Sequence, residues 1–335
     1  MQEFKERVPL LQVIGLEKHF TTQAKGLFKK NTVRAVNQVS FEVYEGETLG
    51  LVGESGCGKS TTGRTVLRLV EPTNGEILYN GENVTGMKLK EFNKIRKDFQ
   101  MIFQDPFASF DPKKRIGYSL EEVMVIQSVG KKEERKARAI ELLKKVGFSE
   151  EHYYRYPHEF SGGQRQRIGI ARALMTNPKF IVCDEAVSAL DVSIQSQILN
   201  LLKELQKDLG LSYLFIGHDL NVVKYISDRI AVMYMGEIIE MAPTEELFAN
   251  PKHPYTKLLL AAIPVANPHK QAERPILKGD IPSPLNIPSG CPFHTRCPYA
   301  TEQCSKIVPE IVHTSEEHSV KCHLFESDVT ERGEN

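Results

Sequence analysis

The sequence contains no long apolar segment. Its most apolar stretch covers residues 258–266, and Pro264 interrupts it. A membrane-spanning helix needs about 20 consecutive apolar residues, so we expect that the chain does not cross a bilayer and that any membrane role depends on a partner. There is no charge excess either. The 43 basic side chains equal the 43 acidic ones, which argues against non-specific attraction to nucleic acid or to anionic lipid.

The first residues also lack the features of an export signal. Residues 1–10 are polar and mixed in charge, whereas a signal peptide carries an apolar core. We therefore expect a cytosolic protein without disulfide bonds. The six cysteines are unevenly spread, because Cys57 and Cys183 stand alone while the other four lie within residues 291–322.

What the sequence does have is an alternation of short apolar runs with amphipathic ones. Strands are predicted from the apolar runs at residues 48–52, 179–183 and 212–216 and from the alternation of apolar and polar residues at 33–43. The amphipathic runs predict helices at residues 59–69, 131–146, 164–175 and 194–209, with a turn at Asn74 and Gly75 and a helix N-cap near Ser193. Strands that are apolar on both faces and alternate with helices indicate an α/β core with a largely parallel sheet. From Pro243 onward prolines recur and periodicity fades, which indicates a tail domain that begins around residues 240–265.

Residues 53–60 match the phosphate-loop pattern G-x-x-x-x-G-K-[ST] between an apolar strand and a helix. The glycines allow successive backbone N–H groups to face phosphate oxygens, and the helix N-terminus adds its positive dipole. Lys59 supplies a full charge to the β- and γ-phosphates, and the Ser60 hydroxyl is suited to coordinate Mg²⁺. The loop therefore predicts nucleotide binding, with Cys57 as a space-filling residue that has no redox role.

Two acids follow the strand at residues 179–183. A buried strand beside the phosphate-loop strand would place Asp184 and Glu185 at the carboxyl edge of the sheet, where ligands bind. Asp184 is suited to hold Mg²⁺ through water, and Glu185 to orient or deprotonate the attacking water. The alternative is that the pair caps the next helix.

Ser161, Gly162 and Gly163 open another predicted helix and form a second possible anion site, built from a hydroxyl and backbone N–H groups without a lysine. One subunit has no need of a second γ-phosphate site. The arrangement makes sense if this site faces the nucleotide of a partner subunit, so that ATP joins two ATPase chains.

With these motifs in place, the chain resembles the ABC ATPase family. Gln104 matches the Q-loop glutamine, Ser161 to Gln164 match the signature motif with Phe160 where leucine is commonest, residues 188–191 match the D-loop, and His218 matches the switch histidine. The resemblance implies an ABC-type nucleotide-binding domain over residues 1–250, with a mainly parallel sheet, an antiparallel β subdomain and a helical signature subdomain at about residues 105–175. Ala186 stands where the family has proline, and we expect only a local change in turn stiffness.

The resemblance also implies a set of residues around ATP and Mg²⁺. Catalysis is expected from Lys59, Gln104, Glu185 and His218, and Mg²⁺ binding from Ser60, Gln104 and Asp184. The nucleotide contacts are expected from Phe20, Gly53, Glu54, Ser55, Gly56, Cys57, Gly58, Lys59, Ser60, Thr61, Gln104, Ser161, Gly162, Gly163, Gln164, Asp184, Asp191 and His218. Phe20 is the candidate for stacking on adenine, and Phe28 is the alternative.

Within the family, the chain is most similar to the oligopeptide/dipeptide importer ATPases of the "F" type. The similarity rests on residues 52–60, 101–109, 253–257 and 291–300. It implies a heterodimer with a "D"-type ATPase subunit under two membrane permeases, at the cytoplasmic face of the membrane, served by an extracytoplasmic binding protein and without nucleic acid. Nickel, glutathione and oligosaccharide importers use similar ATPases, so the solute stays open. A soluble ABC ATPase that acts on DNA or ribosomes is a further alternative, disfavoured by the single ATPase unit.

The tail, expected to be a small irregular domain at residues 251–335, concentrates four thiols. Cys291, Cys297, Cys304 and Cys322 could hold Zn²⁺ or an iron–sulfur cluster. The spacing lacks the paired C-x2-C knuckles usual for structural zinc, and the family resemblance favours a four-iron four-sulfur cluster. Free thiols or disulfides are the other alternative, and a regulatory role for the tail is a separate possibility. His294, His313 and His323 are reserve ligands.

Overall fold

The structure is a computed structural model that describes residues 8–23, 30–105, 107, 109–263 and 282–326. The chain forms two compact units, and each is treated by itself. The first unit comprises Met1–Leu11, Val43–Thr48 and Tyr79–Ile216. The second unit comprises Gln12–Glu42, Leu49–Leu78 and Gly217–Asn335.

A parallel set of strands forms the centre of the first unit. β7 (Phe180–Asp184) lies between β6 (Phe99–Ile102) and β8 (Ser212–Ile216), and all residues of β7 and β8 are buried. Cys183 pairs in register with Ile102 on one side and with Phe215 on the other. Burial on both faces explains why these strands are apolar throughout.

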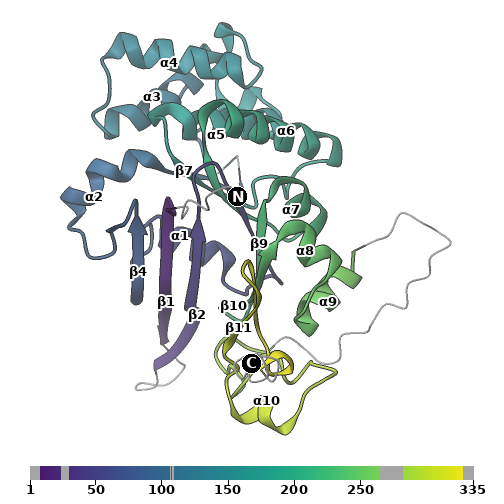
Figure 1. Cartoon of the computed structure of the whole chain (residues 1–335). Helices are drawn as coiled ribbons and strands as arrows, with labels where there is room; N and C mark the ends of the chain where they lie inside the picture. The colour runs from purple at the N-terminus through teal and green to yellow at the C-terminus, as the bar shows by residue number, and fades with distance from the viewer. Residues whose placement is uncertain (1–7, 24–29, 106, 108, 264–281, 327–335) are drawn as a thin grey trace, which may run out of the picture. The chain divides into compact units, whose positions relative to one another are not determined.

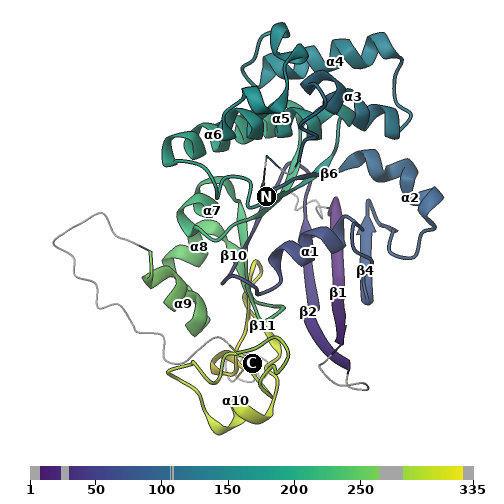
Figure 2. The same cartoon turned by 180° about the vertical axis from the view of Figure 1, so that it is seen from behind.

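In the first unit, α5 contacts β6 of this sheet, α3 and α4 lie close to α5, and α6 lies beside α5 (Figures 1 and 2). The helices of this unit are α2 (Leu89–Ile95), α3 (Ile116–Ile126), α4 (Lys132–Lys145), α5 (Gly162–Ala173) and α6 (Val192–Leu209). The short elements are β5 (Glu82–Asn83) and the 3-10 turns η1 (Arg96–Asp98), η2 (Glu150–Tyr154), η3 (Pro157–Glu159) and η4 (Leu174–Thr176).

Two sets of strands build the second unit. One has the order β11–β12–β10–β9–β3, in which β3 (Thr48–Val52) runs parallel to β9 (Arg229–Tyr234) and the other neighbours are antiparallel. Its remaining members are β10 (Glu237–Pro243), β11 (Ile311–Ser315) and β12 (His318–Lys321). The other set has the order β2–β1–β4, made of β2 (Lys30–Val43), β1 (Leu11–Gln23) and β4 (Asn74–Tyr79).

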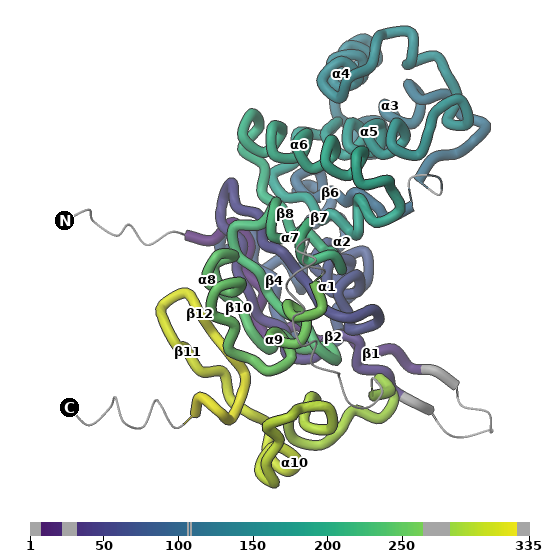
Figure 3. The backbone as a smooth tube through the Cα atoms, turned by 90° about the vertical axis from the view of Figure 1, so that its right-hand side faces the viewer, coloured from purple at the N-terminus to yellow at the C-terminus, as the bar shows by residue number. Residues whose placement is uncertain are grey.

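Short helices complete the second unit. They are α1 (Lys59–Val66), α7 (Leu220–Ile226), α8 (Thr244–Ala249), α9 (Pro254–Ala261), α10 (Glu302–Lys306) and the 3-10 turn η5 (His323–Phe325). Figure 3 shows α10 and the hairpin β11–β12 in the last part of the chain. No helix among the described residues is long and apolar enough to cross a membrane.

Buried hydrogen bonds attach the tail to the rest of the second unit. The Glu240 carboxylate, on β10, accepts from the backbone N–H of Lys252 at 2.6 Å and of His253 at 2.9 Å, and it lies 2.8 Å from Nε2 of His318 on β12. These contacts lower the pKa of Glu240 despite the opposing effect of its burial. Burial also lowers the pKa of His253, to about 4. The tail therefore extends the sheet of the second unit through β12.

Three local predictions are wrong. Asn74 and Gly75 do not form a turn but open β4. The helix after the phosphate loop ends at Val66 rather than near residue 69. The N-cap of α6 is Asp191 and not Ser193, because the helix already begins at Val192. The residues at which helices and strands begin and end depend on caps and tertiary contacts, which hydrophobic periodicity alone does not predict.

Candidate nucleotide-binding site and cysteine pocket

The loop of residues 53–60 connects β3 to α1, as predicted, and two of its glycines are required by their surroundings. A Cβ on Gly53 would lie 2.2 Å from the backbone oxygen of Met233, and one on Gly58 would lie 2.1 Å from that of Ala35. Gly58 also has a φ of 109°, in the left-handed region that side chains avoid. The loop therefore curls in a conformation that only glycine supports at these two positions.

Lys59 lies at the centre of this loop. Its Nζ donates to the backbone oxygens of Gly53 at 2.8 Å and Glu54 at 3.0 Å, and the residue is 5% exposed. α1 begins directly at Lys59 with no side-chain cap and no acidic residue in its first turn, which contains Ser60 and Thr61. An ammonium group at an uncapped helix N-terminus is a local arrangement that attracts an anion.

Cys57 is buried in the same loop, beside the Lys59 ammonium at 3.8 Å. Burial raises the pKa of its thiol, although Lys59 opposes the shift. A neutral, enclosed thiol is a poor nucleophile, which supports the prediction that Cys57 fills space. Ser55 and Gly56, at the tip of the loop, are exposed.

His218 lies in the same unit as the phosphate loop, two residues after the end of β8. The preceding Gly217 donates its N–H to the backbone oxygen of Leu51 on β3 at 3.2 Å, and His218 itself is exposed. The next residue, Asp219, caps α7 by accepting from the N–H of Asn221 at 2.8 Å. These bonds fix the backbone on both sides of His218.

Phe20, the candidate for adenine stacking, lies on β1 and is 39% exposed. The Lys18 ammonium lies 5.1 Å from the centroid of its ring. An exposed aromatic face is compatible with stacking but does not by itself assign it. The alternative, Phe28, lies outside the described residues.

In the first unit, β7 ends with the two predicted acids. Asp184 is 1% exposed, and the backbone N–H of Glu185 donates to the oxygen of Ile216 at 3.0 Å. Glu185 has a φ of 48°, a left-handed conformation that non-glycine residues adopt at a cost. The Gln104 amide nitrogen donates to one Glu185 carboxylate oxygen at 2.8 Å. The predicted Q-loop glutamine is therefore hydrogen-bonded to the predicted catalytic base.

The turn after the acids leads into α6. Ala186 is 2% exposed, and Ser188 donates from both its N–H (3.1 Å) and its hydroxyl (3.0 Å) to the backbone oxygen of Glu185. Asp191 occupies the N-cap position of α6, where it is exposed and makes no side-chain capping bond.

Ser161 caps α5, whose first residues are Gly162 and Gly163. Its hydroxyl accepts from the Gln164 N–H at 3.3 Å, and the Gln164 side chain accepts from the Ser161 N–H at 2.9 Å. Phe160, just before the cap, is 4% exposed and packs edge-on against Phe148 with ring centroids 5.7 Å apart. This aromatic contact explains why a phenylalanine is accommodated here.

Sequence reasoning missed two contacts near these motifs. The Arg165 guanidinium lies 3.5 Å from the centroid of the Phe107 ring, which joins the signature helix to the segment after Gln104. In the second unit, Arg296 pairs with Glu54 of the phosphate loop, with Nη1 to Oε2 at 2.8 Å. The spacing of residues in the sequence predicts neither contact. Phe107 and Arg296 do lie in residues 101–109 and 291–300, two of the segments that carry the similarity to importer ATPases.

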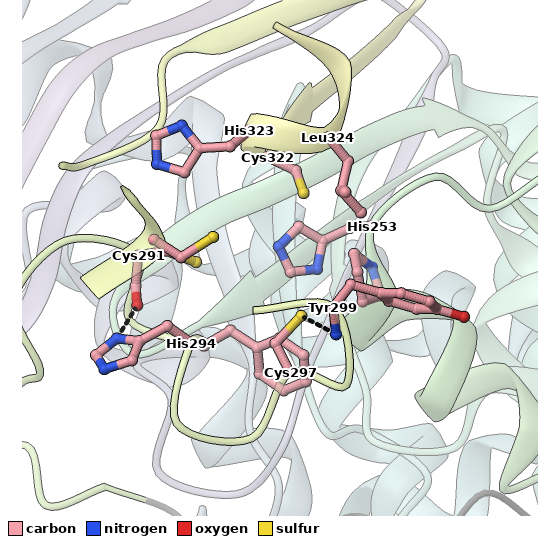
Figure 4. Close-up of a pocket in the computed structure, with 11 residues that line it drawn as sticks. His253, Cys291, His294, Cys297, Tyr299, Cys322, His323 and Leu324 are labelled. Carbon is pink, nitrogen blue, oxygen red and sulfur yellow. Dashed lines mark hydrogen bonds between the residues drawn. The ribbon is translucent and has the colours of Figure 1, made fainter. Parts of the chain in front are cut away.

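The four tail cysteines line one pocket in the second unit, together with His253, Pro254, Phe293, His294, Tyr299, His323 and Leu324 (Figure 4). Among the described residues, no group of three or more His, Cys, Asp or Glu side chains is arranged to hold a metal ion. Burial raises the pKa of the Cys291 and Cys322 thiols to about 11 and also raises that of Cys297.

Two of the three reserve histidine ligands, His294 and His323, line the pocket, and their Nδ1 atoms contact other groups. His294 Nδ1 lies 2.9 Å from the backbone oxygen of Cys291 (Figure 4). His323 has both ring nitrogens in contact with other groups, Nδ1 with Glu326 at 2.7 Å and Nε2 with the oxygen of Ile307 at 3.0 Å. His313 lies on β11, paired with Ser319 of β12. The side-chain donors around the pocket are therefore four thiols and the imidazoles of His253, His294 and His323.

Comparison with known proteins identifies the family. Residues 36–188 match the family model described as ABC transporter, and residues 239–304 match the one described as oligopeptide/dipeptide transporter, C-terminal region. A putative peptide import ATP-binding protein of Brucella ovis is 52% identical over 314 residues, which cover 94% of this chain and 97% of that protein. The chain belongs to the oligopeptide/dipeptide ABC transporter ATP-binding subunits. As predicted from its motifs, this ABC subunit is an ATPase.

Other relatives agree with this assignment. The oligopeptide transport ATP-binding protein AppF of Bacillus subtilis is 49% identical over 321 residues, covering 94% of this chain and 97% of AppF. The dipeptide transport ATP-binding protein DppF of Haemophilus influenzae is also 49% identical over 321 residues, covering 96% of this chain and 98% of DppF.

A solved structure supports the predicted fold. The dimeric ATP-binding cassette MJ0796, bound to ADP and phosphate, is 30% identical, with a TM-score of 0.62 over 70% of this chain and 98% of that one. The prediction of an ABC-type α/β fold is therefore confirmed.

Proposed function

We propose that this ABC subunit hydrolyses ATP to power the import of peptides. The observation that carries the proposal is the match of residues 239–304 to the oligopeptide/dipeptide transporter C-terminal region, on a chain whose cassette motifs are complete. The relatives named for peptide, oligopeptide and dipeptide transport support the same solute class. The proposed domain division is an ATPase domain at residues 1–250 and a transporter-type extension at residues 251–335.

The chemistry is assigned to the residues described above. The loop of residues 53–60 binds the phosphates, with Lys59 against the β- and γ-phosphates and His218 against the γ-phosphate. Ser60, Gln104 and Asp184 would hold Mg²⁺, which offsets phosphate charge. Glu185 takes the proton of the attacking water, and Gln104 fixes the orientation of its carboxylate through the 2.8 Å bond.

The remaining contacts are proposed to come from two chains. Ser161, Gly162, Gly163 and Gln164 cap a helix and offer donors to the γ-phosphate held by a partner ATPase of the "D" type, and Asp191 supports the same interface. The heterodimer would act beneath two permease subunits at the cytoplasmic face of the membrane, fed by an extracytoplasmic binding protein. Phe20 is proposed to stack on adenine.

Solute uptake tests this function. The subunit is reconstituted in liposomes with the permeases, binding protein and second ATPase from its own gene neighbourhood. We expect ATP-dependent uptake of labelled di- or oligopeptides that stops when this subunit is omitted. Nickel, glutathione or an oligosaccharide would be taken up instead if the solute assignment were wrong, and each is assayed in parallel.

We further propose that the cysteine pocket holds a four-iron four-sulfur cluster. The four thiols of Cys291, Cys297, Cys304 and Cys322 are a soft donor set suited to iron–sulfur or zinc. They line one pocket, and no group of three or more His, Cys, Asp or Glu side chains among the described residues is placed to hold a metal ion. A four-iron four-sulfur cluster takes one thiolate on each iron and would therefore use all four thiols. The cluster would stabilise the tail by holding its four cysteines together.

Anaerobic purification tests the cluster. We expect a brown protein with broad absorbance in the blue and with iron and sulfide in equal amounts. Cys297→Ser and Cys304→Ser should each lose the colour, whereas Cys57→Ser, which changes a buried cysteine outside the pocket, should keep it. A colourless protein with stoichiometric zinc would assign the site to that metal, and one without metal would leave free thiols.

A further inference from the structure

The second residue of the phosphate loop is held by the cysteine-rich tail. Arg296 forms a two-pronged ion pair with Glu54, with Nη1 to Oε2 at 2.8 Å and Nη2 to Oε1 at 3.0 Å. The exposed fraction of the side chain is 4% for Arg296 and 19% for Glu54. Paired bonds of this kind fix orientation as well as charge, and partial exclusion of water strengthens them.

A second contact from the segment after β10 reaches the same residue. The Tyr255 hydroxyl accepts the backbone N–H of Glu54 at 3.0 Å. The Tyr255 ring packs on Tyr234 and Phe293, with centroids 4.7 and 5.4 Å away. Both the backbone and the side chain of Glu54 are therefore bound by residues outside the loop.

The residues that hold Glu54 adjoin the cysteine pocket. Arg296 directly precedes Cys297, and Phe293 lines the pocket itself. Arg296 also approaches Tyr234, with its Nη1 3.5 Å from the hydroxyl. A displacement of the chain between Cys291 and Cys297 would therefore move the guanidinium that binds Glu54.

Charge gives this contact a role in nucleotide binding. Glu54 places a carboxylate in a loop whose proposed ligand carries several negative charges, and an uncompensated carboxylate there would repel it. The Arg296 guanidinium cancels this charge and is always protonated at physiological pH. The pair thus makes an acidic loop residue compatible with a phosphate site.

We propose that Arg296 is a positioning residue for the phosphate loop, which it orients and neutralises through Glu54, and that it links the loop to the cysteine pocket. The proposal rests on the proposed nucleotide site at residues 53–60. It makes ATP affinity sensitive to the integrity of the pocket, because the pocket holds the segment that carries Arg296.

A double-mutant cycle on the full-length chain tests the link, with the Kd of ATP measured by equilibrium binding. Arg296→Gln leaves the Glu54 charge unpaired and should weaken ATP binding about tenfold, the size of effect expected from one charged hydrogen-bonded pair. Glu54→Gln should have a smaller effect. The double variant should bind ATP as Glu54→Gln does, because no unpaired carboxylate remains.

Controls separate this role from general destabilisation. Arg68 forms another arginine–glutamate ion pair in the same unit, in which its Nη2 donates to both carboxylate oxygens of the more exposed Glu71 at 3.1 and 3.2 Å, and Arg68→Gln should leave the Kd of ATP unchanged. If Arg296→Gln does not fold, Arg296→Lys replaces it in the cycle. This variant keeps the buried charge, so the changes in the Kd of ATP should follow the same pattern but be smaller. Additive effects in the cycle would overturn the link, whereas failure of the wild-type chain to bind ATP would instead reject the nucleotide site.

Discussion

Glu185→Gln should reduce ATP turnover by at least about a hundredfold while leaving ATP affinity near that of the wild type. A positioned general base contributes roughly 10²–10⁴ to the rate, and an amide cannot accept the proton of the attacking water. The amide oxygen of glutamine can still accept the bond that Gln104 now donates at 2.8 Å, so the local geometry should survive. The loop of residues 53–60, to which we assign phosphate binding, is untouched by the change. Phosphate release and equilibrium ATP binding, measured on the assembled ATPase pair, check the two halves of the prediction.

Glu204→Gln is the matched control for this change. Glu204 is an exposed glutamate on α6 in the same unit, so the substitution removes the same charge without touching the end of β7. It should leave both turnover and affinity unchanged. Retained turnover in Glu185→Gln would remove the base assignment, whereas a matching loss in both variants would point to a non-specific charge effect.

The parts of the fold that could be predicted from the sequence are those that local chemistry dictates. β7 and β8 are apolar throughout because both faces are buried, and the phosphate loop combines two glycines that meet backbone oxygens with a lysine that turns into the loop. The prediction that Ser161, Gly162 and Gly163 open a helix is likewise confirmed, because α5 begins at Gly162 with Ser161 as its N-cap. These strands, the loop and the helix start are determined by residues close together in the sequence, so the sequence pattern is enough to predict them.

The parts that could not be predicted depend on residues far apart in the chain. Gln104 and Glu185 are 81 positions apart, and Arg296 and Glu54 are 242 apart. Motif order predicted a role for each member of the first pair but not that they touch. Nothing in the spacing of the tail cysteines predicted that the arginine beside Cys297 would bind the phosphate loop. The attachment of β12 to β10 was missed for the same reason, because β12 is too short to carry a clear pattern.

Lys59→Ala should weaken ATP binding by about ten- to a hundredfold, and turnover should fall with it. The Lys59 ammonium is 5% exposed and is directed at the loop's own backbone oxygens of Gly53 and Glu54, so it lies where the loop would surround a phosphate. A hydrogen bond to a charged group contributes about 1.5–3 kcal/mol, which corresponds to this range of affinity. The same bonds also brace the loop, so the substitution removes both a charge for the ligand and a support for the loop conformation.

Two comparisons separate these contributions. Lys257→Ala removes an exposed lysine from α9 of the same unit and should leave ATP affinity unchanged. Lys59→Met removes the ammonium but keeps most of the side-chain volume, so it should lose affinity as Lys59→Ala does if charge is the dominant contribution. A methionine variant that binds ATP like the wild type would show that Lys59 acts by filling the loop, and the assignment of its ammonium to the phosphates would be wrong. Because we assign Lys59 to the phosphates and Glu185 to the attacking water, Lys59→Ala should lower affinity and turnover together, whereas Glu185→Gln should lower turnover alone.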